Sequence, residues 1–419
     1  MLEFSDAPYQ FFEARPSRPL IFLGRVLNKA VILRSKEHRI SDIRIHGAED
    51  AVRKAQAAGD RLVFVINHPS HSDAQVLGEV QRRLGVRSCF MAAYDVFLRS
   101  KFCAWSMQKL GNFSIDREGS DRKAMAAAIQ VLKDGERGLN VFPEGNVYLS
   151  NDRVTPFLDG AAFIALKAQA ALKGASVKII PVSIKLTHLA VPREEITARL
   201  QKLAEDSGYI FPKGMKEEPM DAVLGLGHHI IRRLLSDHGF ADALRNYDEL
   251  PLFDLLKNFL EELVSKEEVA LGCVASGKDS MPARIGRIRS RIHQLRMSAG
   301  GAGDKTLHGL AQRAILALRI HGYLTPYLTE KPSIDRYDET VERIAEDFYS
   351  KAMPRTGPRR ALVSIREPLA VADYLKEAGG DLRRVIPVLT RKIQRSVQDG
   401  VDELNALNKA PGGDWVEVG

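Results

Sequence analysis

Cysteine is scarce in this sequence: there are three among 419 residues, Cys89, Cys103 and Cys273, and none is in Cys-x-x-Cys spacing. Thiols so far apart do not build the disulfide framework of a small secreted domain, and they favour a reducing compartment. No uncharged apolar run approaches the roughly 18 residues of a membrane-spanning helix. The first residues, MLEFSDAPYQ, lack the basic and apolar regions of a signal peptide. We therefore expect a cytoplasmic protein.

Unusual composition is also absent, because 45% of the residues are hydrophobic and 27% are charged. These values exclude a disordered tail or a fibrous repeat and allow a substantial core. The net charge of +8 predicts phosphate-bearing partners such as nucleic acid, anionic lipid, CoA or acyl carrier protein. Most of this surplus lies between Met281 and Ile320, where eight basic residues accompany one acid.

The basic segment Arg284–Arg296 predicts a helix with Arg284, Arg287 and Arg291 on one face and isoleucines on another. This face is either simply solvated or docks on anionic lipid or an acidic carrier protein. Nucleic acid is disfavoured, because no aromatic residues are interleaved with the arginines for base stacking.

The most apolar early segment is Leu20–Leu33, which follows Pro19, a common helix start. Arg25 and Lys29 share one face of this expected helix. The other face carries aliphatic side chains, namely Leu20, Leu23, Leu27 and Val31. The segment predicts either a helix packed on its own domain or one lying in a membrane interface.

Strand-like and helix-like segments alternate from Arg61 to about Leu186. The strand-like runs are Leu62–Ile66, Val86–Ala92, Phe113–Ile115, Leu139–Phe142 and Val177–Ile184. This alternation predicts an α/β fold with a mixed sheet flanked by helices.

Helical patterns dominate from about Pro192 to Met353, before a late strand at Ala361–Ile365 and a long helix near Val385–Leu407. We interpret the helical part as an insertion, with a separate helical domain as the alternative. The expected segments are an N-terminal helical or interfacial segment (1–60), the α/β core (61–190), the helical insertion (191–358), and a returning strand with a C-terminal helix (359–419).

The densest group of reactive side chains is NHPSHSD, residues 67–73, directly after the expected strand Leu62–Ile66. Reactive groups gather at such carboxyl ends of strands in α/β sheets. Pro69 keeps His68 off the following helix, so Asp73 in the first helical turn can point back at the imidazole. A carboxylate on one ring nitrogen fixes the tautomer and raises the basicity of the other nitrogen. The pattern predicts a general base without a serine or cysteine nucleophile beside it.

Three further runs follow in order: GNFSIDR (111–117), FPEGN (142–146) and IIPVS (179–183). Pro181 in the last run indicates an edge strand or a bulge. Together with NHPSHSD, these runs resemble the four ordered blocks of the glycerolipid acyltransferase family, which includes 1-acylglycerol-3-phosphate and glycerol-3-phosphate acyltransferases. The resemblance covers roughly residues 61–186, and four blocks in the right order are a specific signal.

The resemblance implies an O-acyltransferase of phospholipid biosynthesis. His68 would deprotonate an acceptor hydroxyl, which attacks an acyl thioester on CoA or acyl carrier protein, and Asp73 would orient the imidazole. The resemblance also implies a set of acceptor-binding residues, namely Gly111, Phe113, Arg117, Glu144 and Gly145. Pro181 would lie on the acyl-donor side. No metal or tightly bound cofactor is implied, and the expected partners are the thioester donor, a lysophospholipid or glycerol phosphate-like acceptor, and the inner face of a membrane.

One departure and two rival interpretations remain. After FPEG the family usually continues Thr-Arg-Ser, whereas this chain has Asn146-Val147-Tyr148, so a different alcohol or amine acceptor is possible. His68, His71 and Asp73 could instead hold the metal of a hydrolase. The third interpretation is a non-enzymatic basic module that binds membranes.

Overall fold

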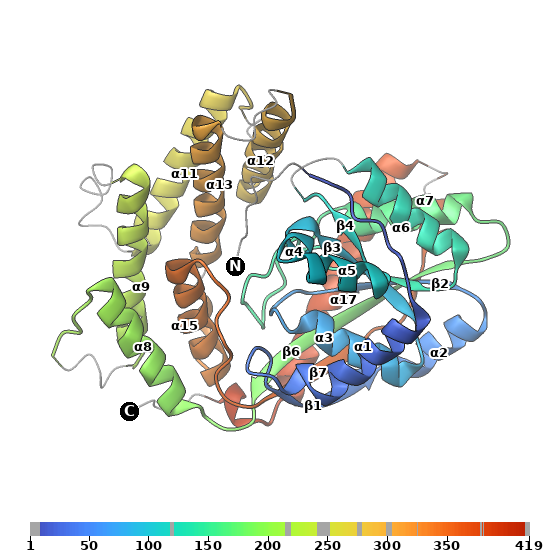
Figure 1. Ribbon diagram of the computed structural model, residues 1–419, viewed down its shortest axis with the longest axis horizontal. Coiled ribbons are helices and arrows are strands. Elements are labelled where there is room, and N and C mark those ends of the chain that lie inside the picture. The colour runs from blue at the N-terminus through green and yellow to red at the C-terminus, as the bar shows by residue number, and fades with distance from the viewer. Residues whose placement is uncertain are drawn as a thin grey trace.

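Eight strands form one sheet at the centre of an α/β unit (Figure 1). The computed structural model describes residues 9–117, 121–213, 219–240, 252–274, 279–298, 304–324, 326–377, 379 and 381–414. The strands are β1 (Ile40–Gly47), β2 (Arg61–Ile66), β3 (Ser88–Ala93), β4 (Phe113–Ile115), β5 (Gly138–Val141), β6 (Val177–His188), β7 (Arg359–Ile365) and β8 (Leu369–Ala370). Their order is β1-β7-β6-β2-β5-β3-β4, and β8 pairs with β6.

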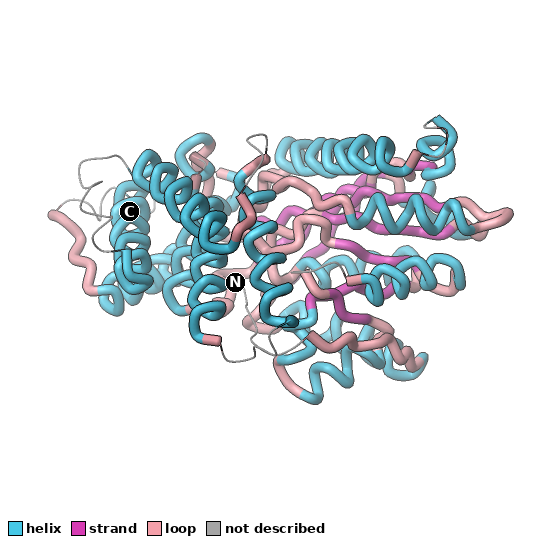
Figure 2. Tube along the Cα trace, turned by 90° about the horizontal axis from the view of Figure 1, so that it is seen from above, coloured by secondary structure: helices cyan, strands magenta, loops and turns pink. Residues whose placement is uncertain are grey.

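Most neighbouring strands run parallel. Only β6 pairs antiparallel, with β7 and with β8, among the described pairings. The prediction of a mixed sheet is therefore confirmed. The strands lie between two helical layers, as Figure 2 shows.

The two faces of the sheet bury different side chains of the same strand. Val63 and Val65 of β2 pack against α6 (Arg122–Asp134), α7 (Gly160–Ala171), α16 (Val371–Glu377) and α17 (Leu382–Leu407). Phe64 and Ile66 face α2 (Glu49–Ala57) and α3 (Asp73–Leu84). A strand that is covered on both faces has a nearly continuous apolar sequence. Strand β2, RLVFVI, has such a sequence, which explains why it could be predicted.

A helical block connects β6 to β7 and lies beside the α/β unit (Figure 1). Its helices are α8 (Arg193–Ser207), α9 (Pro219–Leu235), a π-helical turn (Ser236–Phe240), α11 (Leu252–Leu271), α12 (Met281–Ser298), α13 (Lys305–Tyr323), α14 (Tyr327–Glu330) and α15 (Ile334–Tyr349). One core joins α11, α12 and α13, and another joins α8, α9 and α15. The mainly helical insertion before a returning strand is confirmed, whereas the segment boundaries at 60, 190 and 358 stay predictions.

The N-terminal helix α1 (Arg18–Ala30) is shorter than expected and turns its apolar face outward. It ends before a 3₁₀ turn at Ile32–Arg34. Leu23 and Leu27 are 48% and 43% exposed, whereas the Arg25 side chain turns inward and donates to the carbonyl of Val86 (2.7 Å). The helix therefore packs on its own domain through its polar face, and its apolar face is left outward.

Two further details differ from the sequence prediction. Strand β1 lies inside the segment that was expected to be helical or interfacial. It was not predicted, because its alternating pattern ISDIRIHG is only weakly apolar. Pro181 lies in a central strand rather than at an edge: it pairs with Val65 of β2. Its other side faces the gap between the β7 and β8 pairings, where its missing N–H leaves no ladder bond unmade.

No helix in the part of the chain that the structure describes is long and apolar enough to cross a membrane. The short helices α4 (Tyr94–Leu98) and α5 (Lys101–Lys109) complete the α/β unit between β3 and β4.

Candidate active site

The NHPSHSD turn is fixed to the sheet by its first residue. The Asn67 side chain donates to the carbonyl of Ile184 (2.9 Å) and accepts from the same residue's N–H (2.8 Å). Through these two bonds a side chain extends the pairing of β2 with β6 by one residue beyond the end of β2. They hold the following residue, His68, at the carboxyl end of β2.

His68 and Asp73 are in contact, as the sequence predicted. The Nδ1 atom of His68 lies 2.9 Å from Oδ2 of Asp73, and the N–H of Ser70 donates to the same oxygen (2.8 Å). Asp73 is fully buried, whereas the His68 side chain is 21% exposed. The contact with Asp73 uses Nδ1 and not Nε2 of His68, the arrangement that a general base needs.

Burial raises the pKa of the Asp73 carboxyl. The hydrogen bond and attraction from His68, the N–H of Ser70 and the charge of Arg355 oppose this effect. Asp73 is also the first residue of α3, where the helix dipole favours a negative charge. The carboxylate therefore depends on its neighbours to stay ionised.

Glu144 binds the backbone of His68, and Phe142 stacks on its imidazole ring. The Glu144 carboxylate accepts from the N–H of His68 (2.7 Å) and, with its other oxygen, from the N–H of Thr155 (3.1 Å). The ring of Phe142 stacks on the imidazole with 4.2 Å between centroids and an angle of 18°. Burial raises the pKa of Glu144 to about 7. Both carboxylate oxygens thus bind protein groups, and the expected contact of Glu144 with an acceptor stays a prediction.

Arg117 lies beside the Glu144–Gly145 turn. Its Nη1 donates to the carbonyl of Gly145 (3.0 Å) and to Oδ1 of Asn146 (2.8 Å), and its Nη2 pairs with Asp95 (2.5 Å). Gly145 has a φ of +75°, which favours glycine at this turn. The structure therefore brings Arg117, Glu144 and Gly145 to the His68 turn.

The other three predicted site residues lie in the scaffold. Gly111 turns the chain from α5 into β4 with a φ of +89°, and its carbonyl accepts from Arg137. Phe113 is buried in β4 beside Phe11. Pro181 is buried within β6. Their expected contacts with acceptor and donor stay predictions.

His71 turns away from His68 and toward the helical block. Its Nε2 lies 3.1 Å from Oε2 of Glu346 on α15. Burial lowers the pKa of His71 to about 4, although the hydrogen bond and charge of Glu346 act in the opposite direction. Among the described residues, no three His, Cys, Asp or Glu side chains gather in the way that a metal ion requires.

The helical block touches the site through charged side chains. His293 of α12 lies 3.1 Å from Asp116, and the arginine Arg289 of the same helix interacts with Arg117 and Asp95. Arg284 and Arg287, two of the arginines expected on a docking face, instead form ion pairs with Glu268 and Asp279.

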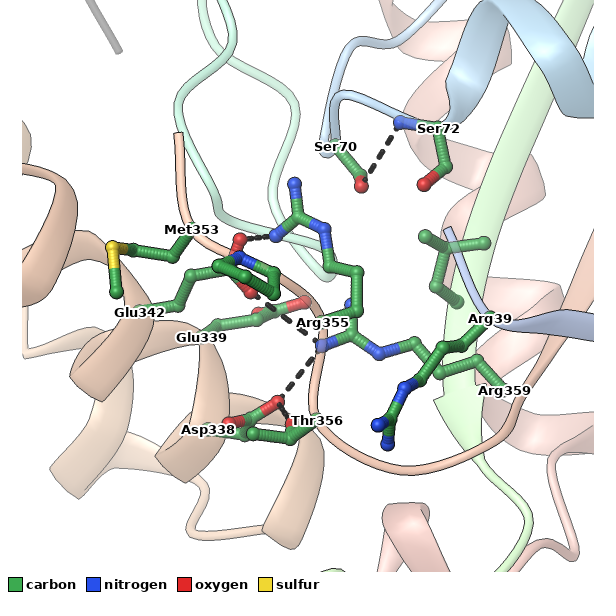
Figure 3. Close-up of polar contacts among 12 residues, drawn as sticks. Arg39, Ser70, Ser72, Asp338, Glu339, Glu342, Met353, Arg355, Thr356 and Arg359 are labelled. Atoms are coloured by element: carbon green, nitrogen blue, oxygen red, sulfur yellow. Dashed lines mark hydrogen bonds and ion pairs between the residues drawn. The ribbon is translucent and has the colours of Figure 1, made fainter. Parts of the chain in front are cut away.

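The helix α15 presents a buried acidic stripe to the α/β unit. It consists of residues spaced three or four apart along one face: Asp335, Asp338, Glu339, Glu342 and Glu346. Asp338 pairs with His188 (3.0 Å) and Arg359 (2.8 Å), as Figure 3 shows in part. Burial of carboxylates on this scale requires cations on the facing surface, and β6 and β7 provide them.

Residues 42–185, roughly a third of the chain, match the model of the Acyltransferase family. This match supports the resemblance of the segment to the glycerolipid acyltransferase family. The match includes the His68–Asp73 turn and all four sequence blocks of the acyltransferase domain.

A 1-acyl-sn-glycerol-3-phosphate acyltransferase of Streptococcus pneumoniae (strain ATCC BAA-255 / R6) is a relative of this domain. It is 38% identical over 94 residues, which are 22% of this chain and 31% of that protein. The matched segment thus spans about a third of the relative's length, and the helical block lies outside the family match, which ends at residue 185.

Several contacts of the acyltransferase domain escaped sequence reasoning. Asp95, the partner of Arg117, lies in a short helix without a motif, and Glu346 lies 275 residues beyond His71. Phe142 was part of the FPEGN run, but its stacking on the imidazole depends on how β5 and β2 are placed side by side.

Proposed function

We propose that this protein transfers a fatty acyl group from a thioester of CoA or acyl carrier protein to a hydroxyl of a phosphate-bearing acceptor, such as a lysophospholipid or glycerol phosphate. The observation that carries the proposal is the His68–Asp73 contact of 2.9 Å at the carboxyl end of β2, inside an acyltransferase-family domain.

The proposed reaction needs only one proton carrier. Nε2 of His68 takes the proton of the acceptor hydroxyl while the oxygen attacks the thioester carbonyl. The new C–O bond forms, the C–S bond breaks, and the leaving thiolate receives the proton from the imidazolium. Asp73 stabilises the imidazolium through Nδ1. A base placed in this way contributes about 10²–10⁴-fold to the rate.

Arg117 is the proposed contact for the acceptor's phosphate. Its guanidinium lies next to the turn that holds His68, and arginine pairs with phosphate in two-pronged geometry. Arg117→Ala should raise KM for a phosphate-bearing acceptor more than KM for the acyl donor. Equal changes in both constants would mean that Arg117 does not bind the phosphate.

The experiment that tests the function combines labelled acyl-CoA and acyl carrier protein thioesters with a panel of lysolipids, glycerol phosphate and simple alcohols and amines. Products are identified by mass spectrometry, and His68→Ala serves as the control. We expect an ester product that the variant does not form. Absence of any acyl product, or equal formation by the variant, would contradict the proposal.

A membrane surface is the proposed location of the reaction. The α1–α5 surface, defined as the exposed apolar side chains of these two helices, comprises Phe22, Leu23, Val26, Leu27, Phe102 and Trp105. The two helices are adjacent, because the N–H of Ser17 binds the carbonyl of Lys109 (2.9 Å). No acidic residue occurs between positions 14 and 36 or between 96 and 115. Apolar side chains among cations suit anionic lipid.

Sedimentation with phosphatidylglycerol-containing vesicles tests this location. Replacing Phe22 and Phe102, which are 72% and 74% exposed, with Glu should move the protein from the pellet to the supernatant. Leu407→Glu is the matched control, since Leu407 is 48% exposed on α17. Unchanged sedimentation of the double variant would refute the assignment of this surface.

A further inference from the structure

The buried carboxylate of Asp73 is only half satisfied by hydrogen bonds. Its Oδ2 accepts from both His68 and Ser70, whereas its buried Oδ1 has no hydrogen-bond partner within the described part of the chain. An ionised carboxylate in such a place is costly unless a cation lies near it. A positive charge from elsewhere in the fold would therefore stabilise the ionised form.

Arg355 is placed to supply this charge. It lies between α15 and β7, is 2% exposed, and its backbone N–H binds the carbonyl of Lys36 (3.0 Å). Figure 3 shows its guanidinium between Glu342 of α15 and the turn that carries Ser70 and Ser72. On one side Arg355 forms an ion pair with Glu342, and its buried Nε has no hydrogen-bond partner among the described residues.

Arg355 acts electrostatically on several ionisable groups at the His68 turn. Its charge lowers the pKa of Asp73, of His71 and of His38, whose ring binds Ser72 (3.0 Å). The groups that face Arg355 come from every element packed around it: Arg199 of α8, Asp338 and Glu342 of α15, Arg359 of β7, His38, His71 and Asp73.

We propose that Arg355, contributed by the segment after the helical block, is a positioning residue that keeps Asp73 ionised and so holds the His68 imidazole in its working orientation. Arg355 acts on Asp73 through space and does not touch substrate. The helical block is then part of the catalytic unit, because its acidic stripe fixes Arg355 through Glu342.

The sign of the expected effect follows from charge. Removing a cation near Asp73 makes its ionisation harder and raises its pKa, so the acid limb of kcat/KM moves to higher pH. An opposite charge nearby typically lowers a carboxyl pKa by about one unit or more, so we expect Arg355→Met to shift this limb upward by about one pH unit. Arg355→Lys keeps the charge and should leave the limb in place.

The experiment measures kcat/KM against pH for wild type, Arg355→Met, Arg355→Lys and the control Arg360→Met, whose arginine pairs with the exposed Asp42. A lower rate at all pH values without a displaced limb would overturn the proposal, as would equal displacement by Arg355→Lys or Arg360→Met. A merely structural arginine would give the first of these results.

The kinetic test rests on the proposed acyl transfer, so a second readout is independent of it. In protein labelled with ¹⁵N-histidine, the ring signals of His68, assigned with His68→Gln, should report the ionisation of Asp73. The midpoint pH at which the His68 signals follow the ionisation of Asp73 should be higher in Arg355→Met than in wild type. In Arg355→Lys this midpoint should be unchanged. If wild type transfers no acyl group but this response shifts, the function fails and the positioning role stands; an unshifted response overturns the role.

Discussion

Two histidines three residues apart on one turn serve different parts of the molecule. His68 and His71 are about equally exposed, at 21% and 22% of their side chains. His68 contacts Asp73, five residues away on the same turn, whereas His71 contacts Glu346, 275 residues away on the helical block. The first contact is local to the acyltransferase domain, and the second joins that domain to the insertion.

The comparison extends to the charges of the two regions. In the acyltransferase domain the two buried carboxylates that bind His68, those of Asp73 and Glu144, lie close to it in short turns. In the helical block the carboxylates form the extended acidic stripe of α15. One of them, Asp338, forms ion pairs with both His188 and Arg359. We infer that the stripe holds the two regions together and, through Glu342, keeps Arg355 in place beside the local pair.

The largest effect should separate the two histidines. We expect His68→Ala to lower kcat/KM by about 10²–10⁴-fold, because it removes the proposed base. His71→Ala should lower it less than about tenfold, because only an interface hydrogen bond is lost. Steady-state assays and circular dichroism of both variants check this. If both variants are folded and lose kcat/KM to a similar extent, the two histidines do not have different roles.

The next effect concerns the stability of the interface. Lys185 of β6 is 2% exposed and pairs with Asp152, which also binds Arg336 (2.8 Å). Lys185→Met removes one of the two cations that bind the buried Asp152 carboxylate, and breaking a buried ion pair from one side costs about 3–5 kcal/mol. Denaturant unfolding measures this free energy. Lys178→Met is the control, because Lys178 lies on the same strand and forms no ion pair within the described residues. Equal losses would contradict the assigned role of the Lys185 pair.

Sequence reasoning located the elements whose pattern is local. The limits of β4 were predicted without error, and β2 to within one residue, because a buried strand is a short apolar run. Strand β1 was missed, since an outer strand with alternating charged residues resembles an irregular segment. For α1 the sequence left two alternatives open, because periodicity defines two faces of a helix without saying which one packs.

The same division holds for the candidate site. His68, Asp73, Arg117, Glu144 and Gly145 lie in motifs, and the structure brings them together. Phe142, Asp95 and Arg355 become neighbours of this group only through tertiary packing. A pair five residues apart is set by one turn, whereas a pair separated by nearly three hundred residues depends on how the whole helical block docks.

A smaller effect should appear at acid pH. Burial acts to raise the pKa of Asp152, but attraction to Lys185 and hydrogen bonds from Lys185 and Arg336 outweigh it, so its pKa lies below the ordinary value. The pKa of Asp338 is lowered in the same way by His188 and Arg359. The stabilisation is therefore present above the unfolded-state pKa of about 4 and is lost as the pH falls below it. Unfolding free energies from pH 6 to pH 3 should decrease, and less steeply in Asp338→Asn; equal slopes would contradict the link to this carboxylate.

The smallest effect should come from a charge pair at the surface of the same sheet. Arg360 of β7 pairs with Asp42 of β1 at 2.6 Å, but the Asp42 side chain is 37% exposed. Water screens such a pair, so Asp42→Asn should change the free energy of unfolding by less than about 1 kcal/mol. Parallel denaturation of this variant and Lys185→Met compares two ion pairs that differ mainly in burial. If the surface pair contributed as much as the buried one, charge pairing alone would explain the stability of the sheet, and the buried stripe of α15 would have no special part in joining the two regions.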